Sequence, residues 1–234
     1  MAATVMHPDP LIATAISFEK RFDSVNQFIV KLQKHGLETW YQDIIGCILL
    51  RCRTNFGHLM KAYQRPFDTE CLAWATRNLL ELAVWAKFAT ASKANAQRLH
   101  DDHLVDLSEL QRNILSLGTA HNAKPRDLNT LRCHGQWIDL MKDELGLDPQ
   151  GKHLNIGSVA KEVGAADVFY SFNGMLSKFV HPTAFSLLLT LDEAMEKELR
   201  TMFCAVGQGF TQDTLSALIG FFDGIGLDTE LLKP

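Results

Sequence analysis

The stretch DTECLAWATRNLLELAVWAKFATA, residues 68–91, decides the fold class of this chain. Its apolar side chains, Leu72 and Leu79 among them, recur at the spacing of one helix face and not at the alternating spacing of a strand. Asp68 is a typical helix N-cap residue, and Glu70 places a negative charge in the first turn, where the helix dipole favours it. The stretch therefore predicts one long helix.

The same helical period recurs along most of the chain, and strand patterns are scarce. Helices are expected at about residues 10–34, 38–63, 68–91, 94–117, 125–145, 158–164, 165–180, 191–206 and 211–223. No linker is long or polar enough to mark a domain boundary. We therefore predict an all-α, single-domain bundle of about eight helices over residues 1–234, with no significant sheet. Its core is expected at about 10–182, followed by a C-terminal helical extension at about 190–226.

Local signals define the expected helix ends near the C-terminus. His181-Pro182 ends one helix, because a residue before proline avoids the helical conformation. Residues 190–193, Thr-Leu-Asp-Glu, form a capping box, so the next helix is expected to begin there. Residues 185–189 are therefore expected to form an extended or irregular connection. Gly207 and Gly209 are expected to separate the last two helices.

The composition is that of a protein with a packed core and no global excess of positive charge. Hydrophobic residues make up 47 % of the chain and charged residues 21 %, which excludes disordered and low-complexity classes. The formal net charge is −4, whereas a dedicated nucleic-acid binder usually carries a basic excess. Residues 44–67 nevertheless contain no acidic side chain, so they form either a segment that binds phosphate or an acidic partner, or a solvated helix face. The basic side chains of this segment are Arg51, Arg53, His58, Lys61 and Arg65.

Cysteine usage and the N-terminus point to a cytoplasmic protein. The five cysteines are an odd number without C-x-x-C spacing, which favours reduced thiols over disulfides or a zinc site. Met1–Pro10 lacks the features of a signal peptide, and no apolar run is long enough to cross a membrane. The phosphate-binding and dinucleotide-binding glycine motifs are missing as well. We therefore expect no membrane partner, no cofactor and no metal.

Two groups of side chains are best suited to chemistry. Arg77 and Glu81 are four residues apart, so they share a helix face within an apolar stretch. Tyr170, Ser177 and His181 are spaced 7 and 4 apart, which aligns them along one helical stripe. All three can donate and accept hydrogen bonds. Two interpretations stay open: a polar site with His181 as general acid or base, or a buried hydrogen-bond network between the two helices.

These motifs carry a family resemblance. The order Arg-x3-Glu, then Tyr-x6-Ser-x3-His-Pro, resembles a bacterial family of all-helical proteins catalogued as a domain of unknown function. The preceding segment 156–164 is similar to the pattern of that family, and the resemblance covers roughly residues 43–189. It implies a helical fold and no particular activity. The candidate site residues that it marks are Arg77, Glu81, Tyr170, Ser177 and His181.

A more distant resemblance is to HEPN helical domains, many of which are ribonucleases of toxin and phage-defence systems. In their signature an arginine, which holds phosphate, shortly precedes a histidine that acts as acid or base near the end of a helix. Here the only base within residues 173–180 is Lys178, which cannot replace the guanidinium fork. The resemblance implies an alternative in which Arg77, from another helix, acts with His181.

The segment His100-Asp101-Asp102-His103 resembles the His-Asp doublet of metal-dependent HD phosphohydrolases. Those enzymes need further ligands, and His58 with Asp106 or Asp139 could supply them. Two histidines three residues apart do not by themselves define a metal site, however. A solvated helix face is the preferred interpretation.

The sequence thus favours a protein-interaction or structural module with a buried Arg/Glu/Tyr/Ser/His network. The alternative is an HEPN-like ribonuclease or phosphate-handling enzyme that uses Arg77 and His181, and whether the protein is an enzyme stays open. A protein partner or a second copy of the chain is the expected partner, and RNA is the less favoured one. A dimer could use the apolar C-terminal run Leu215, Leu218, Ile219, Phe221 and Phe222, which could equally pack internally.

Overall fold

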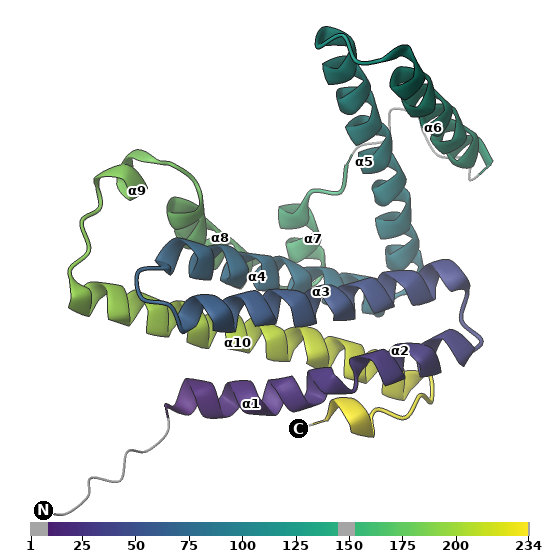
Figure 1. Ribbon diagram of the computed structural model, residues 1–234. Coiled ribbons are helices and arrows are strands. Elements are labelled where there is room, and N and C mark those ends of the chain that lie inside the picture. Colours follow the sequence, from purple (N-terminus) through teal and green to yellow (C-terminus); the bar gives the residue numbers. More distant parts are fainter. Residues whose placement is uncertain (1–8, 145–152, 234) are drawn as a thin grey trace, which may run out of the picture. The chain divides into compact units, whose positions relative to one another are not determined.

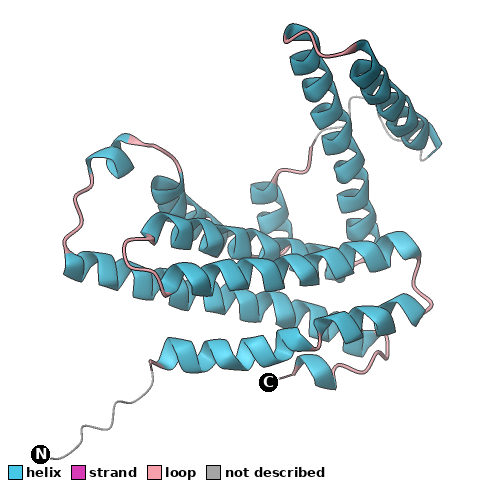
Figure 2. Ribbon diagram, in the orientation of Figure 1, coloured by secondary structure: helices cyan, strands magenta, loops and turns pink. Residues whose placement is uncertain are grey.

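The computed structural model describes residues 9–144 and 153–233. All regular elements in these ranges are helices, without a strand, which confirms the all-α prediction (Figure 2). The contacts group the chain into two compact units. Unit 1 comprises Met1–Lys93 and Ile156–Pro234, and unit 2 comprises Ala94–Asn155.

The helices of both units can be followed in Figure 1. Unit 1 contains α1 (Pro10–Asp23), α2 (Val25–Lys34), α3 (Thr39–Tyr63), α4 (Thr69–Ala91), α7 (Ile156–Glu162), α8 (Ala166–Val180), α9 (Ala184–Leu188), α10 (Glu193–Gly224) and the 3-10 turn η1 (Glu230–Leu232). Unit 2 is formed by α5 (Lys93–Ala120) and α6 (Pro125–Glu144). No helix in the described ranges combines the length and the apolar character that a bilayer crossing requires.

Helix α4, the stretch that decides the fold class, is the centre of unit 1. It packs against α3, α8 and α10, and its buried face is rich in alanine and leucine. Helix α10 lies along α3 and α4, so the predicted C-terminal extension is part of this packed core (Figure 1). Leu215, Leu218 and Phe222 are fully buried in it, and the apolar run therefore packs internally.

The predicted break between two C-terminal helices was wrong, because α10 is continuous from Glu193 to Gly224. The reason is packing at Gly207: a Cβ atom there would lie 2.7 Å from Leu59 Cδ1 and 3.2 Å from Thr76 Oγ1. The absent side chain lets α10 approach its neighbours, and the Thr76 hydroxyl lies 3.0 Å from the Phe203 carbonyl oxygen. This close packing offsets the low helix propensity of glycine.

Three other boundaries differ from the predictions. The first predicted helix is divided at Ser24 into α1 and α2. The predicted connection at 185–189 is largely helix α9, because Thr183 and Ser186 cap each other reciprocally. The N-cap of α10 is Asp192, whose carboxylate accepts a hydrogen bond from Met195 N–H at 2.8 Å, and not the predicted threonine.

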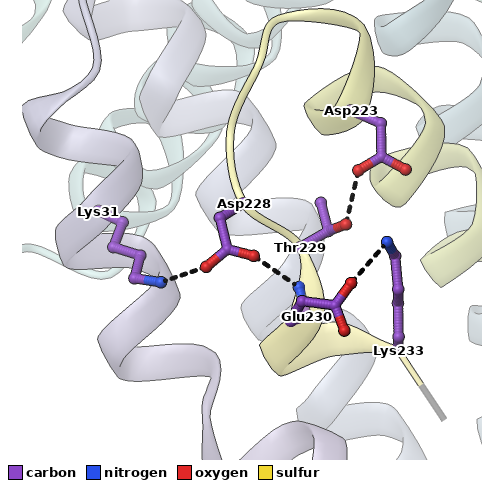
Figure 3. Close-up of polar contacts among 6 residues, drawn as sticks. All are labelled: Lys31, Asp223, Asp228, Thr229, Glu230 and Lys233. Atoms are coloured by element: carbon purple, nitrogen blue, oxygen red, sulfur yellow. Dashed lines mark hydrogen bonds and ion pairs between the residues drawn. The ribbon is translucent and has the colours of Figure 1, made fainter.

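Polar contacts attach the C-terminal end of the described chain to α2 (Figure 3). Lys31 Nζ lies 3.1 Å from Asp228 Oδ2, and Asp228 Oδ1 accepts from Glu230 N–H at 3.1 Å. The Thr229 hydroxyl donates to Asp223 Oδ1 at 2.6 Å. The Glu230 N–H and the Lys31 ammonium both favour the carboxylate, and they hold the pKa of Asp228 below its usual value.

Candidate functional site

The candidate site begins with an ion pair on α4. Arg77 Nε lies 3.2 Å from Glu81 Oε1, at the i,i+4 spacing that places both on one helix face. Their side chains are 25 % and 31 % exposed, so solvent reaches the pair. Glu81 thus fixes one edge of the guanidinium group and leaves its other donors available.

His181 joins this pair from the C-terminal end of α8. Its N–H donates to Ser177 O at 3.3 Å as the cap of the helix, and its own carbonyl oxygen accepts from the Ser186 hydroxyl at 2.9 Å. The imidazole Nε2 lies 3.0 Å from Arg77 Nη1. Because a guanidinium can only donate, Nε2 is the acceptor in this contact. We call Arg77, Glu81 and His181 the Arg–His cluster.

Tyr170 and Ser177 do not belong to the Arg–His cluster. The Tyr170 ring is 49 % exposed and lies 5.7 Å from Lys161 Nζ, and the Ser177 side chain is half-buried. Among the described side chains, no hydrogen bond or ion pair joins either residue to the cluster. The predicted buried network of five side chains is therefore not formed.

The rotation of α8 explains this correction. Phe169, Leu176 and Phe179 are buried and form the face of α8 that packs into unit 1. Burial of these large apolar side chains dominates the orientation, so the polar stripe faces solvent. His181 reaches Arg77 because the chain is already extended at this residue, with φ −107° and ψ 145°.

A groove between α3 and α4 lies next to the cluster and has a volume of about 310 Å³. Glu81 belongs to both, since it lines the groove and accepts from Arg77. We call this cavity the α3/α4 groove. It is lined by Arg51, Thr54, Asn55, His58, Trp74, Asn78, Glu81, Leu82 and Trp85.

Polar and aromatic groups share the walls of the α3/α4 groove. Asn78 Nδ2 donates to Asn55 Oδ1 at 3.0 Å, and Asn55 Nδ2 donates to Arg51 O at 2.8 Å. The Trp74 ring is 43 % exposed and lies 5.7 Å from the His58 ring, edge to face. Sequence reasoning missed this groove. The helical spacing of Trp74, Asn78 and Trp85, which places them on one face of α4, could have indicated it.

The base-rich segment of α3 is exposed only in part. Arg51, His58 and Lys61 are exposed, whereas Arg53 is half-buried. Arg65 follows the helix and lies 4.0 Å from Asp68, so that acidic residue neutralises it in part. The exposed bases are spaced 7 and 3 residues apart and share one stripe of α3.

Unit 2 contains the His-Asp segment. Within the described part of the chain, Asp102, Asp106 and His153 are the group with ligand atoms close enough to share a metal ion, and His100 and His103 are outside it. His153 Nδ1 lies 2.9 Å from Asp106 Oδ1, and burial raises the pKa of Asp102. The doublet His100-Asp101 is not part of this group, so the arrangement differs from the one that the resemblance to HD phosphohydrolases predicts.

Phe179, Phe185 and the first turns of α10 border a second groove, of about 440 Å³. Its walls are almost entirely apolar, and Phe185 and Met195 are each 47 % exposed. Large exposed apolar side chains gathered in one place are typical of surfaces that contact other proteins.

Comparisons with known proteins do not identify the chain. No family model, curated protein sequence or solved structure matches it. The resemblances to the bacterial family and to HEPN domains therefore stay predictions. The function has to be inferred from the site itself.

Proposed function

We propose that unit 1 is a metal-independent ribonuclease module whose reacting groups are Arg77 and His181. The observation that carries the proposal is the 3.0 Å contact between Arg77 Nη1 and His181 Nε2, two residues that are 104 positions apart. An arginine held by a carboxylate, beside an imidazole whose Nε2 faces it as an acceptor, provides both a phosphate fork and a proton acceptor. His181 is exposed, which supports the ribonuclease function, because a histidine in a buried structural network would be inaccessible to solvent and substrate.

The chemistry follows from the donor and acceptor roles of these groups. A phosphodiester takes the Arg77 donors that Glu81 does not occupy, and this contact releases His181 Nε2 from Arg77. His181 then accepts the proton of the ribose 2′-hydroxyl, and the 2′-oxygen forms a bond to phosphorus. The bond from phosphorus to the 5′-oxygen breaks, and that oxygen leaves with a proton from solvent. The products are a 2′,3′-cyclic phosphate and a 5′-hydroxyl. We include in this proposal a cytoplasmic role in a toxin or defence system.

Cleavage of end-labelled single-stranded RNA in the presence of a metal chelator tests the proposal. We expect cyclic-phosphate products from the unaltered protein and a loss of rate of about 100-fold or more in His181→Ala. Arg77→Lys should also lose most of the rate, because lysine retains the charge but not the fork. Tyr170→Phe, on the same stripe of α8 but outside the Arg–His cluster, is the matched control. Cleavage that persists in His181→Ala, or no cleavage at all, would contradict the proposal.

A protein-binding function is the second candidate, and the apolar groove beside Phe179 is the observation that favours it. In this case Phe185 and Met195 would contact an apolar helix of a partner. Replacement of Met195 by glutamate should then abolish complex formation with that partner without changing RNA cleavage. If Met195→Glu leaves every complex of the protein intact, this groove is not an interaction surface.

A further inference from the structure

We propose that the α3/α4 groove binds a guanine base of single-stranded RNA. This inference rests on the ribonuclease function proposed above, because it names the part of the substrate that would lie next to the reacting groups. The site has its own geometry, however, and can be tested without any cleavage. Four observations carry it: the residues that line the groove, its size, its aromatic walls and its hydrogen-bonding groups.

The lining residues come from one face of each helix. On α3, Arg51, Asn55 and His58 are 4 and 3 residues apart, and on α4, Trp74 and Asn78 are 4 apart. Faces of neighbouring helices that look toward each other are normally apolar and closely packed. Here they carry amide, carboxylate, imidazole, guanidinium and indole groups around a cavity. Such a lining is suited to a polar, aromatic ligand and not to the packing of another helix.

The size of the groove restricts the ligand. A volume of about 310 Å³ is at the lower end of the range for small-molecule sites, which is roughly 300–1,000 Å³. One nucleoside fits this range, whereas a dinucleotide cofactor does not. A base that enters the groove from a flexible single strand needs no unpairing, which makes single-stranded RNA the appropriate source.

The two tryptophans provide stacking surfaces. Trp74 is 43 % exposed at the rim, and Trp85 is half-buried and lines the same groove. Indole rings are the strongest stacking partners for bases, and removal of one typically weakens binding by about 5- to 150-fold. The His58 ring packs against the Trp74 ring in a T-shaped contact.

The polar groups select the base. Asn78 Nδ2 is used by Asn55, which leaves the Asn78 carbonyl oxygen as an acceptor, and Arg77 takes one oxygen of Glu81 and leaves the other. Two acceptors on the α4 wall match the adjacent N1–H and N2–H₂ donors of guanine. On the α3 wall Arg51 and His58 supply donors, and guanine O6 and N7 are acceptors. Adenine would place its N1 acceptor against the acceptors of α4, and a pyrimidine lacks the second donor.

Charge around the groove fits an RNA strand. Arg51, His58 and Lys61 form the exposed basic stripe of α3, and no acidic residue lies in the sequence between residues 44 and 67. Phosphates on either side of the bound base would meet this stripe. Because Glu81 lines the groove and also holds Arg77, the base and the phosphate to be cleaved would be neighbours along the strand.

Titration of the protein with each of the four nucleosides tests the inference. Binding is measured by tryptophan fluorescence and by calorimetry. Nucleosides carry no phosphate, so their binding reports on the groove and not on the Arg–His cluster. We expect guanosine to bind at least tenfold more tightly than adenosine, cytidine or uridine. Trp74→Ala should weaken guanosine binding by at least fivefold, and Trp137→Phe, at an exposed tryptophan in unit 2, should leave it unchanged.

The outcomes separate this inference from the ribonuclease proposal. His181-dependent RNA cleavage without any preference for guanosine would overturn the guanine site alone. Guanosine binding that is lost in Trp74→Ala, with no cleavage of RNA, would support the groove and overturn the ribonuclease proposal. The nucleoside comparison uses the unaltered protein, so it decides the question even if a Trp74 variant fails to fold.

Discussion

Arg77 shows how one side chain connects separate parts of the site. Its guanidinium contacts Glu81 along α4 and His181 at the end of α8, with donors that point in different directions. Each of these contacts is partly exposed, so each contributes little to stability, about 0–1 kcal/mol by comparison with other surface pairs. A cluster that adds so little to the fold is better explained by a role in binding, which is why cleavage is the appropriate measurement for Arg77→Lys.

Tyr63 gives a residue-scale prediction that concerns pH. Its hydroxyl donates to Asp9 Oδ2 at 2.7 Å, and burial followed by the Asp9 carboxylate raises the pKa of Tyr63 to about 12. An unfolded tyrosine has a pKa near 10, so the folded state binds this proton more tightly. The stabilisation is therefore fully present below pH 10 and is lost as the pH rises through 12.

Absorbance of tyrosinate during an alkaline titration checks this prediction. We expect a late step in the native protein that Tyr63→Phe removes, and a steeper loss of stability above pH 10 in the unaltered protein than in the variant. Tyr41, which burial also shifts upward, remains in the variant as an internal reference. If Tyr63→Phe instead removes a step near pH 10 and leaves the late step in place, the hydrogen bond to Asp9 is not present in solution.

At the scale of elements, alanine substitutions at two glycines of α10 are expected to change the free energy of unfolding in opposite directions. A Cβ at Gly207 would overlap the fully buried Leu59 side chain, whereas nothing lies within 4 Å of a Cβ at exposed Gly209. Gly207→Ala should lower the free energy of unfolding by about 1–3 kcal/mol, because the packed core cannot make room. Gly209→Ala should raise it by up to about 1 kcal/mol through helix propensity alone.

Denaturant unfolding of the two alanine variants measures both effects, and Gly209→Ala is the matched control for Gly207→Ala. Similar unfolding midpoints for the two variants would mean that α10 does not approach Leu59 and Thr76 as closely as the structure has it. This pair also tests whether α10 is one continuous helix, since a break at these glycines would make both substitutions alike.

At the scale of the whole molecule, local sequence signals predicted most of the helices but not the contacts between them. The apolar spacing after Asp68 correctly predicted α4, because periodicity acts within a few residues, although the Asp68 side chain makes no capping hydrogen bond. Gly207 was misinterpreted, since the close neighbours that permit a glycine inside α10 come from α3 and α4. The spacing of Arg77 with Glu81 was informative within one helix, but their contact with His181 depends on how α8 rotates against α4.

The α3/α4 groove escaped prediction for the same reason. Arg51 and His58 form one wall and Trp74 and Asn78 form the other, and only tertiary packing sets the two walls opposite each other. The sequence pattern of each wall alone is typical of an ordinary solvated or amphipathic helix face. The functions proposed for this chain therefore depend on surfaces shared between helices, which single-helix patterns cannot show.

Thiol accessibility provides a prediction for the molecule as a whole. Cys47, Cys71 and Cys133 are exposed, whereas Cys52 and Cys204 are buried in unit 1. Burial raises the pKa of Cys52 and of Cys204 to about 12, so neither forms the reactive thiolate near neutral pH. A thiol reagent should therefore label the three exposed cysteines in the native protein, Cys71 more slowly than the other two because its hydrogen bond with Asp68 raises the pKa of its thiol, and it should label the buried pair only when unit 1 opens.

The labelling rate of the protected pair then reports on unfolding of the core. Gly207→Ala should accelerate labelling of Cys52 and Cys204, because a less stable core opens more often, and it should leave the exposed thiols unaffected. Gly209→Ala should slow the labelling of Cys52 and Cys204. Mass spectrometry of labelled protein distinguishes the sites, and equal, rapid labelling of all five cysteines in native protein would show that α3 and α10 do not pack together as a closed core.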